Sequence, residues 1–170
     1  MERDDRPNGS PLSDSQYRRF SSCCYDWELW VALDGAILYC SPSAERIAGY
    51  TAEEFVSNPD LVVEIVHPDD REDFVAWHES VLGSKEIGPE YEYRITGRDG
   101  EVRWISRCGM PVVTEEGQLL GRHISHRDST SHRETEAKLR EARDYLENLI
   151  GYANAPIIVW DAQLCIVRFN

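Results

Sequence analysis

The sequence contains little positive charge, and nearly all of it comes from arginine. Its 170 residues include 18 lysines and arginines against 31 aspartates and glutamates, which gives a formal net charge of −13. Lys85 and Lys138 are the only lysines. Because nucleic-acid and lipid phosphates are repelled by an acidic surface, this balance argues against DNA, RNA or an anionic membrane as a partner.

Long apolar runs are also missing. No stretch approaches the roughly 18 to 20 apolar residues that cross a bilayer, and the polar N-terminus lacks the apolar centre of a signal peptide. We therefore expect no membrane contact by this segment and a cytoplasmic location. The five cysteines form no C-x-x-C pair, and an odd number without a secretion signal predicts reduced thiols.

The sequence lacks the motifs of common catalytic and metal sites. It contains no G-x-S-x-G elbow and no glycine-rich phosphate loop. Asp69, Asp70 and Glu72 stand where a helix should begin, so capping explains them better than acid–base catalysis. His123 and His126 should point to opposite faces of a strand and cannot share an ion. We predict no enzymatic activity and no metal site for this chain.

Apolar periodicity and turn residues predict an α+β domain. The pattern predicts two strands, over residues 27–33 and 36–40, joined by a tight turn at Asp34-Gly35. Short helices should follow, and one of them should begin with a capping box at Thr51. The last of these helices should end near Leu82. The period then changes from 3.6 to 2, which predicts three antiparallel strands backed by the helices. One face of the middle strand should carry Val102, Trp104, Ser106, Cys108 and Met110.

A second helical segment should start at Ser131, where S-x-x-E forms a capping box with Glu134. Its apolar residues follow the 3-4-3-4 spacing of a coiled-coil seam. This spacing predicts a homodimer through the helix, and the alternative is a helix folded back on its own sheet. The seam consists of Leu139, Ala142, Leu146, Leu149 and Ala153.

The chain contains a loose internal repeat. Residues 30–41 (WVALDGAILYCS) recur as residues 159–170 (VWDAQLCIVRFN), each with two short strands around a turn. We therefore expect a disordered or helical extension over residues 1–24 and a complete domain over 25–130. A linker helix should follow over 131–153, and residues 154–170 should form the truncated start of a second domain.

Four stretches resemble a PAS domain with its C-terminal PAC motif. They are SPSAERIAGYTAEEF (residues 41–55), HPDDRE (67–72), YEYRITGRDGEVRW (91–104) and GRHISHRDST (121–130). The similarity covers residues 25–130, and a second, truncated copy is similar from about Leu149. The resemblance implies a five-stranded antiparallel sheet whose short helices enclose a small pocket. It also implies a sensor or dimerisation module that precedes an output domain.

Further residues match the family at the end of the last strand. Asp128 and Thr130 correspond to the D-x-T junction where that strand gives way to a signalling helix, and Ser129 stands where isoleucine is usual. The linker resembles those of multi-PAS sensor histidine kinases, and diguanylate cyclases use similar arrays. The resemblance thus implies a downstream output domain of the same protein, with a histidine kinase favoured over a cyclase.

The phases of the helix and strands predict which side chains line the pocket. The candidates are Phe74, His78, Tyr93, Trp104 and Ile124. The cofactor, if one exists, is not identified. The flavin–cysteine motif G-x-N-C-R-F-L-Q has no counterpart, which leaves non-covalent flavin, heme at His78, a small-molecule ligand, or an adaptor without any ligand.

Basic residues on the last two strands give one further indication. They are Arg103, Arg107, Arg122 and Arg127. They could bind an anionic ligand on the sheet, although solvated strand edges carry similar residues.

Overall fold

The computed structural model describes residues 23–151, 158–160, 163 and 166–169, and the chain divides into two compact units. The first unit ends at Ser129 and the second begins at Thr130. Each is described separately below. Almost all of the expected N-terminal extension lies outside the described residues.

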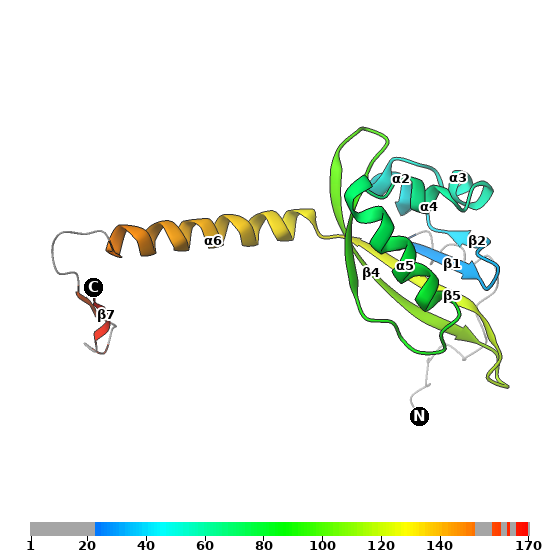
Figure 1. The fold of residues 1–170 in the computed structure, drawn as a ribbon. Helices are drawn as coiled ribbons and strands as arrows, with labels where there is room; N and C mark the ends of the chain where they lie inside the picture. The colour runs from blue at the N-terminus through cyan, green and yellow to red at the C-terminus, as the bar shows by residue number, and fades with distance from the viewer. Residues whose placement is uncertain (1–22, 152–157, 161–162, 164–165, 170) are drawn as a thin grey trace, which may run out of the picture. The chain divides into compact units, whose positions relative to one another are not determined.

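The first unit is built on a five-stranded antiparallel sheet in the order β2-β1-β5-β4-β3 (Figure 1). Its strands are β1 (Trp27–Ala32), β2 (Ile37–Cys40), β3 (Tyr91–Thr96), β4 (Val102–Val113) and β5 (Leu119–Asp128). The last three strands agree with the change of period in the sequence. The α+β class and the five-stranded antiparallel sheet are therefore confirmed.

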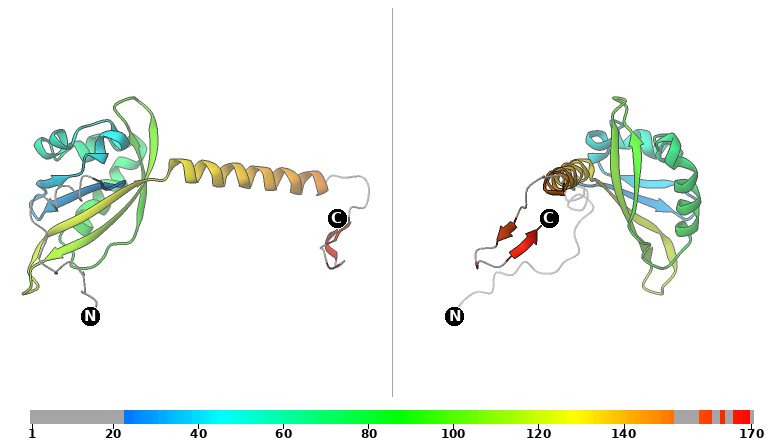
Figure 2. Two further views of the ribbon diagram at one scale, coloured as in Figure 1. Left: turned by 180° about the vertical axis from the view of Figure 1, so that it is seen from behind. Right: turned by 60° about the vertical axis from the view of Figure 1, so that its left-hand side comes forward.

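Short helices lie over one face of this sheet (Figure 2). They are α2 (Ser43–Ala48), α3 (Ala52–Ser57), α4 (Leu61–Glu64), the 3₁₀ helix η1 (Pro68–Asp70) and α5 (Arg71–Leu82). The capping box at Thr51 is present, since its hydroxyl accepts from the Glu54 N–H at 3.3 Å and Glu54 accepts from the Thr51 N–H at 2.8 Å. We call the helix-covered side of the sheet its inner face and the other side its outer face.

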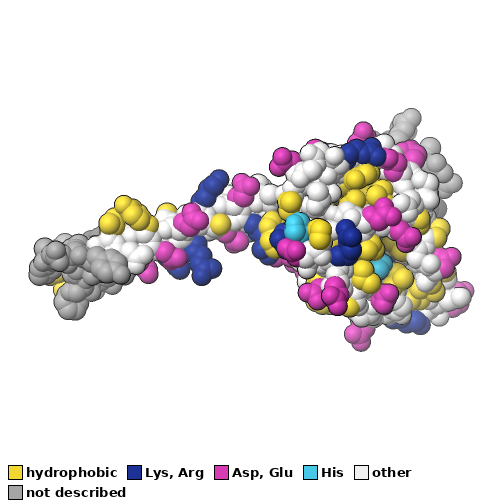
Figure 3. Space-filling view, turned by 45° about the horizontal axis from the view of Figure 1, so that its top comes forward, with side chains coloured by type: hydrophobic (Ala, Val, Ile, Leu, Met, Phe, Trp, Pro, Cys, Tyr) yellow, Lys and Arg dark blue, Asp and Glu magenta, His cyan; other side chains and the backbone are white. Residues whose placement is uncertain are grey.

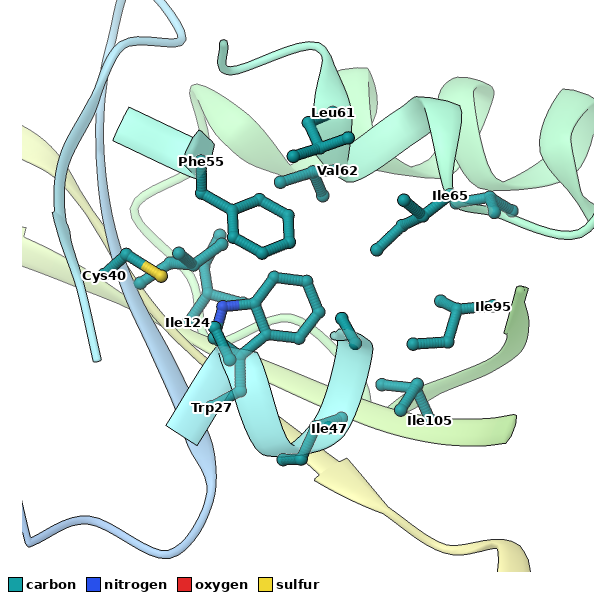
Figure 4. Packing of buried hydrophobic residues seen from close by; sticks show 14 of the residues in the cluster. Trp27, Cys40, Ile47, Phe55, Leu61, Val62, Ile65, Ile95, Ile105 and Ile124 are labelled. Atoms are coloured by element: carbon teal, nitrogen blue, oxygen red, sulfur yellow. The ribbon is translucent and has the colours of Figure 1, made fainter. Parts of the chain in front are cut away.

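The hydrophobic core lies between the inner face and the helices (Figure 4). Trp27 of β1 is fully buried, and its ring centroid lies 4.7 Å from that of Phe55 in α3. Its indole nitrogen is turned toward the sulfur of Cys40. Ile95 and Ile105 extend the core below α4.

The second unit begins with helix α6 (Thr130–Gly151), one residue earlier than expected, so Ser131 lies inside the helix rather than at its cap. The predicted seam residues Leu139, Leu146 and Leu149 are all more than half exposed. Ala153 lies outside the described residues. Within the described part of the chain, no helix has the length and apolar character required to cross a membrane.

The hairpin of β6 (Ile158–Trp160) and β7 (Ile166–Phe169) repeats the pairing of β1 with β2. Leu29 pairs with Cys40 and Trp30 with Tyr39, and a register shift follows Trp30. In the second hairpin, Ile158 pairs with Phe169 and Val159 with Arg168, and the register shifts after Val159. All pairs and both irregularities coincide when residues 30 and 159 are aligned, as in the sequence repeat.

Candidate functional site

Four polar side chains from four elements gather between α5 and the inner face of the sheet. Alternation along the strands directs Tyr93 of β3, Arg107 of β4 and His126 of β5 inward, where His78 of α5 meets them. Arg107 and His126 are direct partners across the β4–β5 ladder. We call these four residues the buried polar cluster.

Arg107 is the charged centre of this cluster, and only 2% of it is exposed. Its Nη2 donates to Nδ1 of His78 at 2.9 Å. Its guanidinium carbon lies 4.8 Å from the ring centroid of Trp77 and 5.4 Å from that of Phe74, both within cation–π range. Among the described residues, Nε and Nη1 have no hydrogen-bond partner. Burial lowers the pKa of Arg107 to about 10, so the side chain remains a cation at neutral pH.

His126 is fully buried and neutral. Burial, followed by the charge of Arg107, holds its pKa well below the usual value. Nδ1 lies 3.3 Å from the carbonyl oxygen of Trp27, an acceptor, so Nδ1 carries the proton. Nε2 therefore has a free lone pair, and within the described chain it has no partner. The His126 ring stacks on Trp27 with centroids 4.3 Å apart.

His78 connects the cluster to the surface. It stacks on Phe74 at 5.7 Å, and burial and the adjacent Arg107 lower its pKa to about 4. It also forms part of the wall of a surface hollow between α4 and α5, together with Val63, Val75 and several charged side chains. Because Arg107 donates to Nδ1 of the neutral ring, the proton of His78 is on Nε2.

This tautomer does not fit the expectation of heme at His78. An axial histidine binds iron through a lone pair, and its other nitrogen usually donates to a carboxylate or carbonyl. Here Nδ1 already accepts from Arg107 and Nε2 carries the proton. Among the described residues, no group of three or more histidine, cysteine or acidic side chains is arranged to hold a metal ion.

Tyr93 completes the cluster with a hydroxyl group. Its side chain is 1% exposed, its ring lies 4.5 Å from that of Phe74, and burial raises the pKa of its hydroxyl. Within the residues that the structure describes, its hydroxyl has no hydrogen-bond partner. The cluster therefore offers one positive charge, several N–H and O–H donors and one strong acceptor. Such convergent polar groups among aromatic side chains are typical of a small-molecule site.

Arg122 also lies on the inner face, but its role is structural. Its Nη1 donates to the carbonyl oxygens of Val81 and Ser84 at 2.9 and 2.8 Å. Its Nη2 donates to the carbonyl oxygens of Glu86 and Gly109 at 3.1 and 2.8 Å. The bonds to Val81, Ser84 and Glu86 fix the C-terminal end of α5 and the following loop to the sheet, and the bond to Gly109 joins β5 to β4.

The structure brings four of the five predicted pocket residues to the inner side. Phe74, His78 and Tyr93 surround Arg107 or contact one another, and Ile124 is buried on β5 next to His126 in inward phase. Trp104 requires a correction. It pairs with Arg94 and lies on the outer face, because its neighbour Ile105 occupies the inner one.

Arg107 and His126 were not among the predicted pocket residues. The sequence indicates Arg107 only as one of four basic strand residues that could bind an anionic ligand, and it considers His126 only together with His123. Strand alternation could have identified both residues. Arg107 is two residues from the buried Ile105 on β4, and His126 is two residues from the buried Ile124 on β5, so each shares the inward face with its isoleucine.

The end of β5 is fixed to β4 immediately before α6 begins. The backbone N–H of Ser129 donates to the carbonyl oxygen of Trp104 at 2.9 Å, and the Ser129 hydroxyl donates to the same oxygen at 3.3 Å. An isoleucine at this position would lack the second bond. Asp128 is the last residue of β5 and Thr130 the first of α6, so a single residue, Ser129, separates the strand from the helix along the chain.

Comparison with known proteins agrees with this architecture. A family model described as "PAS fold" matches residues 37–123. A methyl sulfide methyltransferase-associated sensor from Methanosarcina acetivorans is 29% identical over 109 residues. That match covers 62% of this chain but only 11% of the relative, so the chain spans about a tenth of that protein's length.

Two solved structures have similar folds. A sensory box histidine kinase/response regulator from Burkholderia thailandensis is 26% identical with a TM-score of 0.56, and the match covers 78% of this chain and 98% of that one. The N-terminal domain of a diguanylate cyclase with PAS/PAC sensor from Marinobacter aquaeolei is 20% identical with a TM-score of 0.55. That match covers 64% of this chain and 98% of the other.

Proposed function

This chain belongs to the PAS-fold family, and we propose that it senses a small ligand in the buried polar cluster and passes the signal through α6. The family match supports a sensor module of a signalling protein. The observation that carries the proposed mechanism is the continuity of β5. This strand holds His126 in the cluster and runs through Ser129 directly into α6. A ligand that displaces β5 relative to β4 would thereby act on the start of the helix.

The output domain in this proposal is a histidine kinase, with a diguanylate cyclase as the second candidate. The similarity to the sensory box histidine kinase/response regulator supports the first choice. The repeated pairing in the hairpin β6–β7 supports a second PAS copy following α6. The chain is thus proposed as one module in a series, with α6 as the connection between modules.

The relay can be tested at the junction. We expect Asp128→Ala, in a protein that joins this chain to its output domain, to leave the domain folded and to reduce signal-dependent output by about tenfold, which is within the usual range of coupling between two sites. The reason is that Asp128 is the last strand residue before the helix. Glu101→Ala is the control, because it removes an exposed acid from the turn before β4. Output that responds equally in both variants would rule out a relay through this junction.

The proposed relay also requires two helices to pair. Leu139, Leu146 and Leu149 are exposed along one side of α6, and two copies of this seam would bury them in a parallel homodimer. Ion pairs at i,i+4 spacing flank it, with Lys138 3.9 Å from Glu134 and Arg140 4.0 Å from Asp144. Such pairs stabilise an exposed helix but add little to association.

We expect the wild-type chain to be dimeric in analytical ultracentrifugation and the double variant Leu146→Asp/Leu149→Asp to be monomeric. Four carboxylates would then meet in the seam of each dimer, at a cost far above the few kcal/mol that two heptads contribute. Glu141→Asp/Glu147→Asp is the control. It places two aspartates on the same helix outside the seam and leaves the net charge unchanged. A wild-type chain that is monomeric at high micromolar concentration contradicts the proposal.

A further inference from the structure

We propose that the buried polar cluster binds a small organic carboxylate that also carries a hydroxyl group. This inference rests on the proposed sensing function, because it names the chemical class of the ligand for the same site.

The charge of Arg107 has no ionic partner within the described chain, although the protein is strongly acidic. Acidic side chains are distributed over the face of the molecule drawn in Figure 3. Four other arginines pair with them: Arg94 with Asp70, Arg98 with Glu54, Arg103 with Asp99 and Arg127 with Asp26. Arg107 is far more buried than these. Around it lie neutral His78, aromatic rings and a second buried cation, Arg122, whose charge also lowers the pKa of Arg107. Burying an unpaired charge is costly, so an anion that pairs with it would bind favourably.

The unused polar atoms specify more than charge. Nε and Nη1 of Arg107 are donors, and the Tyr93 hydroxyl can donate as well. These atoms, together with Nε2 of His126, have no partner among the residues described and are all buried. A carboxylate would accept from Arg107 and Tyr93. A hydroxyl group on the same ligand would donate to the lone pair of His126.

A carboxylate fits the charge of the cluster better than a phosphate does. Arg107 is the only cation in it, because burial keeps His78 and His126 neutral. One carboxylate balances one guanidinium. Arg122, the other buried arginine on the inner face, already donates from Nη1 and Nη2 to four carbonyl oxygens, so a phosphate dianion would find unused cationic donors only on Arg107 and its second charge would be poorly balanced.

The test uses three small probes on the full chain. Glycolate has both groups, acetate lacks the hydroxyl, and glycolamide has the hydroxyl but no charge. The guanidinium Nε–H signal of Arg107 is followed by NMR, and the melting temperature is measured at constant ionic strength set with chloride. Probes this small bind weakly, so concentrations on the order of tens of millimolar are needed.

We expect glycolate to shift the Arg107 Nε–H signal and to raise the melting temperature, with acetate binding several-fold more weakly. Glycolamide should bind at least about tenfold more weakly than glycolate, because hydrogen bonds to a charged group are much stronger than neutral ones. Inorganic phosphate should not shift the Arg107 signal more than sulfate or chloride does.

Two variants and a control locate the effect. Arg107→Met should abolish the response to glycolate and, without added anion, should melt at the same or a higher temperature than the wild type. Tyr93→Phe removes one hydroxyl from a retained ring and should weaken glycolate binding by several-fold. Arg127→Met makes the same substitution on the outer face, where Arg127 is exposed and pairs with Asp26, and should leave glycolate binding unchanged.

The outcomes separate this inference from the sensing function. If glycolamide binds as tightly as glycolate and Arg107→Met retains both, the cluster binds neutral ligands, and only the carboxylate inference fails. If acetate and glycolate cause no shift at the Arg107 signal, the carboxylate site is refuted. If, in addition, the relay variant Asp128→Ala responds normally, the sensing function fails as well.

Discussion

Replacing Gly121 with alanine should destabilise the domain by about 3 to 4 kcal/mol, which is a large fraction of the stability of a small domain. Gly121 lies on β5 opposite Ala32 of β1, with φ of +154°. A Cβ at this position would overlap the carbonyl oxygen of Val31 and lie 3.1 Å from Cα of Ala32. These atoms belong to the backbone of a paired strand, so they cannot move aside without breaking the ladder.

Gly117→Ala provides the matched control. Gly117 also has positive φ, +79°, but a Cβ there would meet no atom within 4 Å. Its cost should therefore be limited to the strain of the left-handed conformation, about 1 kcal/mol. Both values can be measured by urea unfolding followed by tryptophan fluorescence. Equal destabilisation by the two substitutions would show that the close approach of β1 and β5 at Gly121 is not important.

The sequence predicted the strands of the sheet more reliably than the orientation of their faces. Alternation over residues 91–110 located β3 and β4 because period 2 does not depend on which face is buried. The prediction that Trp104 of β4 faces the pocket was wrong. It followed from the more apolar side chains on the Trp104 face of the strand, since the opposite face carries Arg103 and Arg107. The structure buries the face with Ile105 and Arg107, because Tyr93 and the aromatic residues of α5 cover them. A one-residue error in phase inverts every side chain.

Sequence patterns also could not predict very short helices or the exact residue at which a helix begins. Helix α4 has four residues, too few for any periodicity to be recognised. Helix α6 begins at Thr130 because Ser129 remains bonded to Trp104 of β4, a tertiary contact that a capping motif at Ser131 does not reveal. Phe74, His78 and Tyr93 were predicted for the pocket because helical and strand phases agree there.

The buried polar cluster should make the free energy of unfolding depend on pH, and the direction of this dependence follows from the pKa values of its histidines. His78 and His126 are neutral in the folded protein. The pKa of His78 is lowered to about 4 and that of His126 is lowered well below 6.5, in both cases mainly by burial and next by the charge of Arg107. In the unfolded chain both titrate near 6.5. As pH falls below 6.5, the unfolded state binds protons that the folded state does not, so stability decreases. Each histidine contributes a slope of about 1 kcal/mol per pH unit in this window.

His123 acts in the opposite direction with smaller effect. Its Nε2 lies 2.8 Å from a carboxylate oxygen of Glu28, and this hydrogen bond raises the pKa of His123. Its stabilising contribution is complete below the unfolded pKa and is lost as pH rises through the folded one. Because 43% of this side chain is exposed, solvent weakens the pair. The two buried histidines should therefore determine the net trend between pH 6.5 and 4.5.

We expect the free energy of unfolding to fall by about 3 to 4 kcal/mol between pH 6.5 and pH 4.5 in urea titrations of the wild type. His126→Asn keeps an N–H that can donate to the Trp27 carbonyl, and His78→Gln keeps an oxygen that can accept from Arg107. Each substitution removes one titrating group, so each should reduce the loss by about half. The double variant should retain only the slope of its carboxylates and the opposite, smaller contribution of His123. A wild-type stability that is constant over this interval would mean that the folded histidines take up protons freely, and the neutral, acceptor-bearing cluster around Arg107 would be refuted.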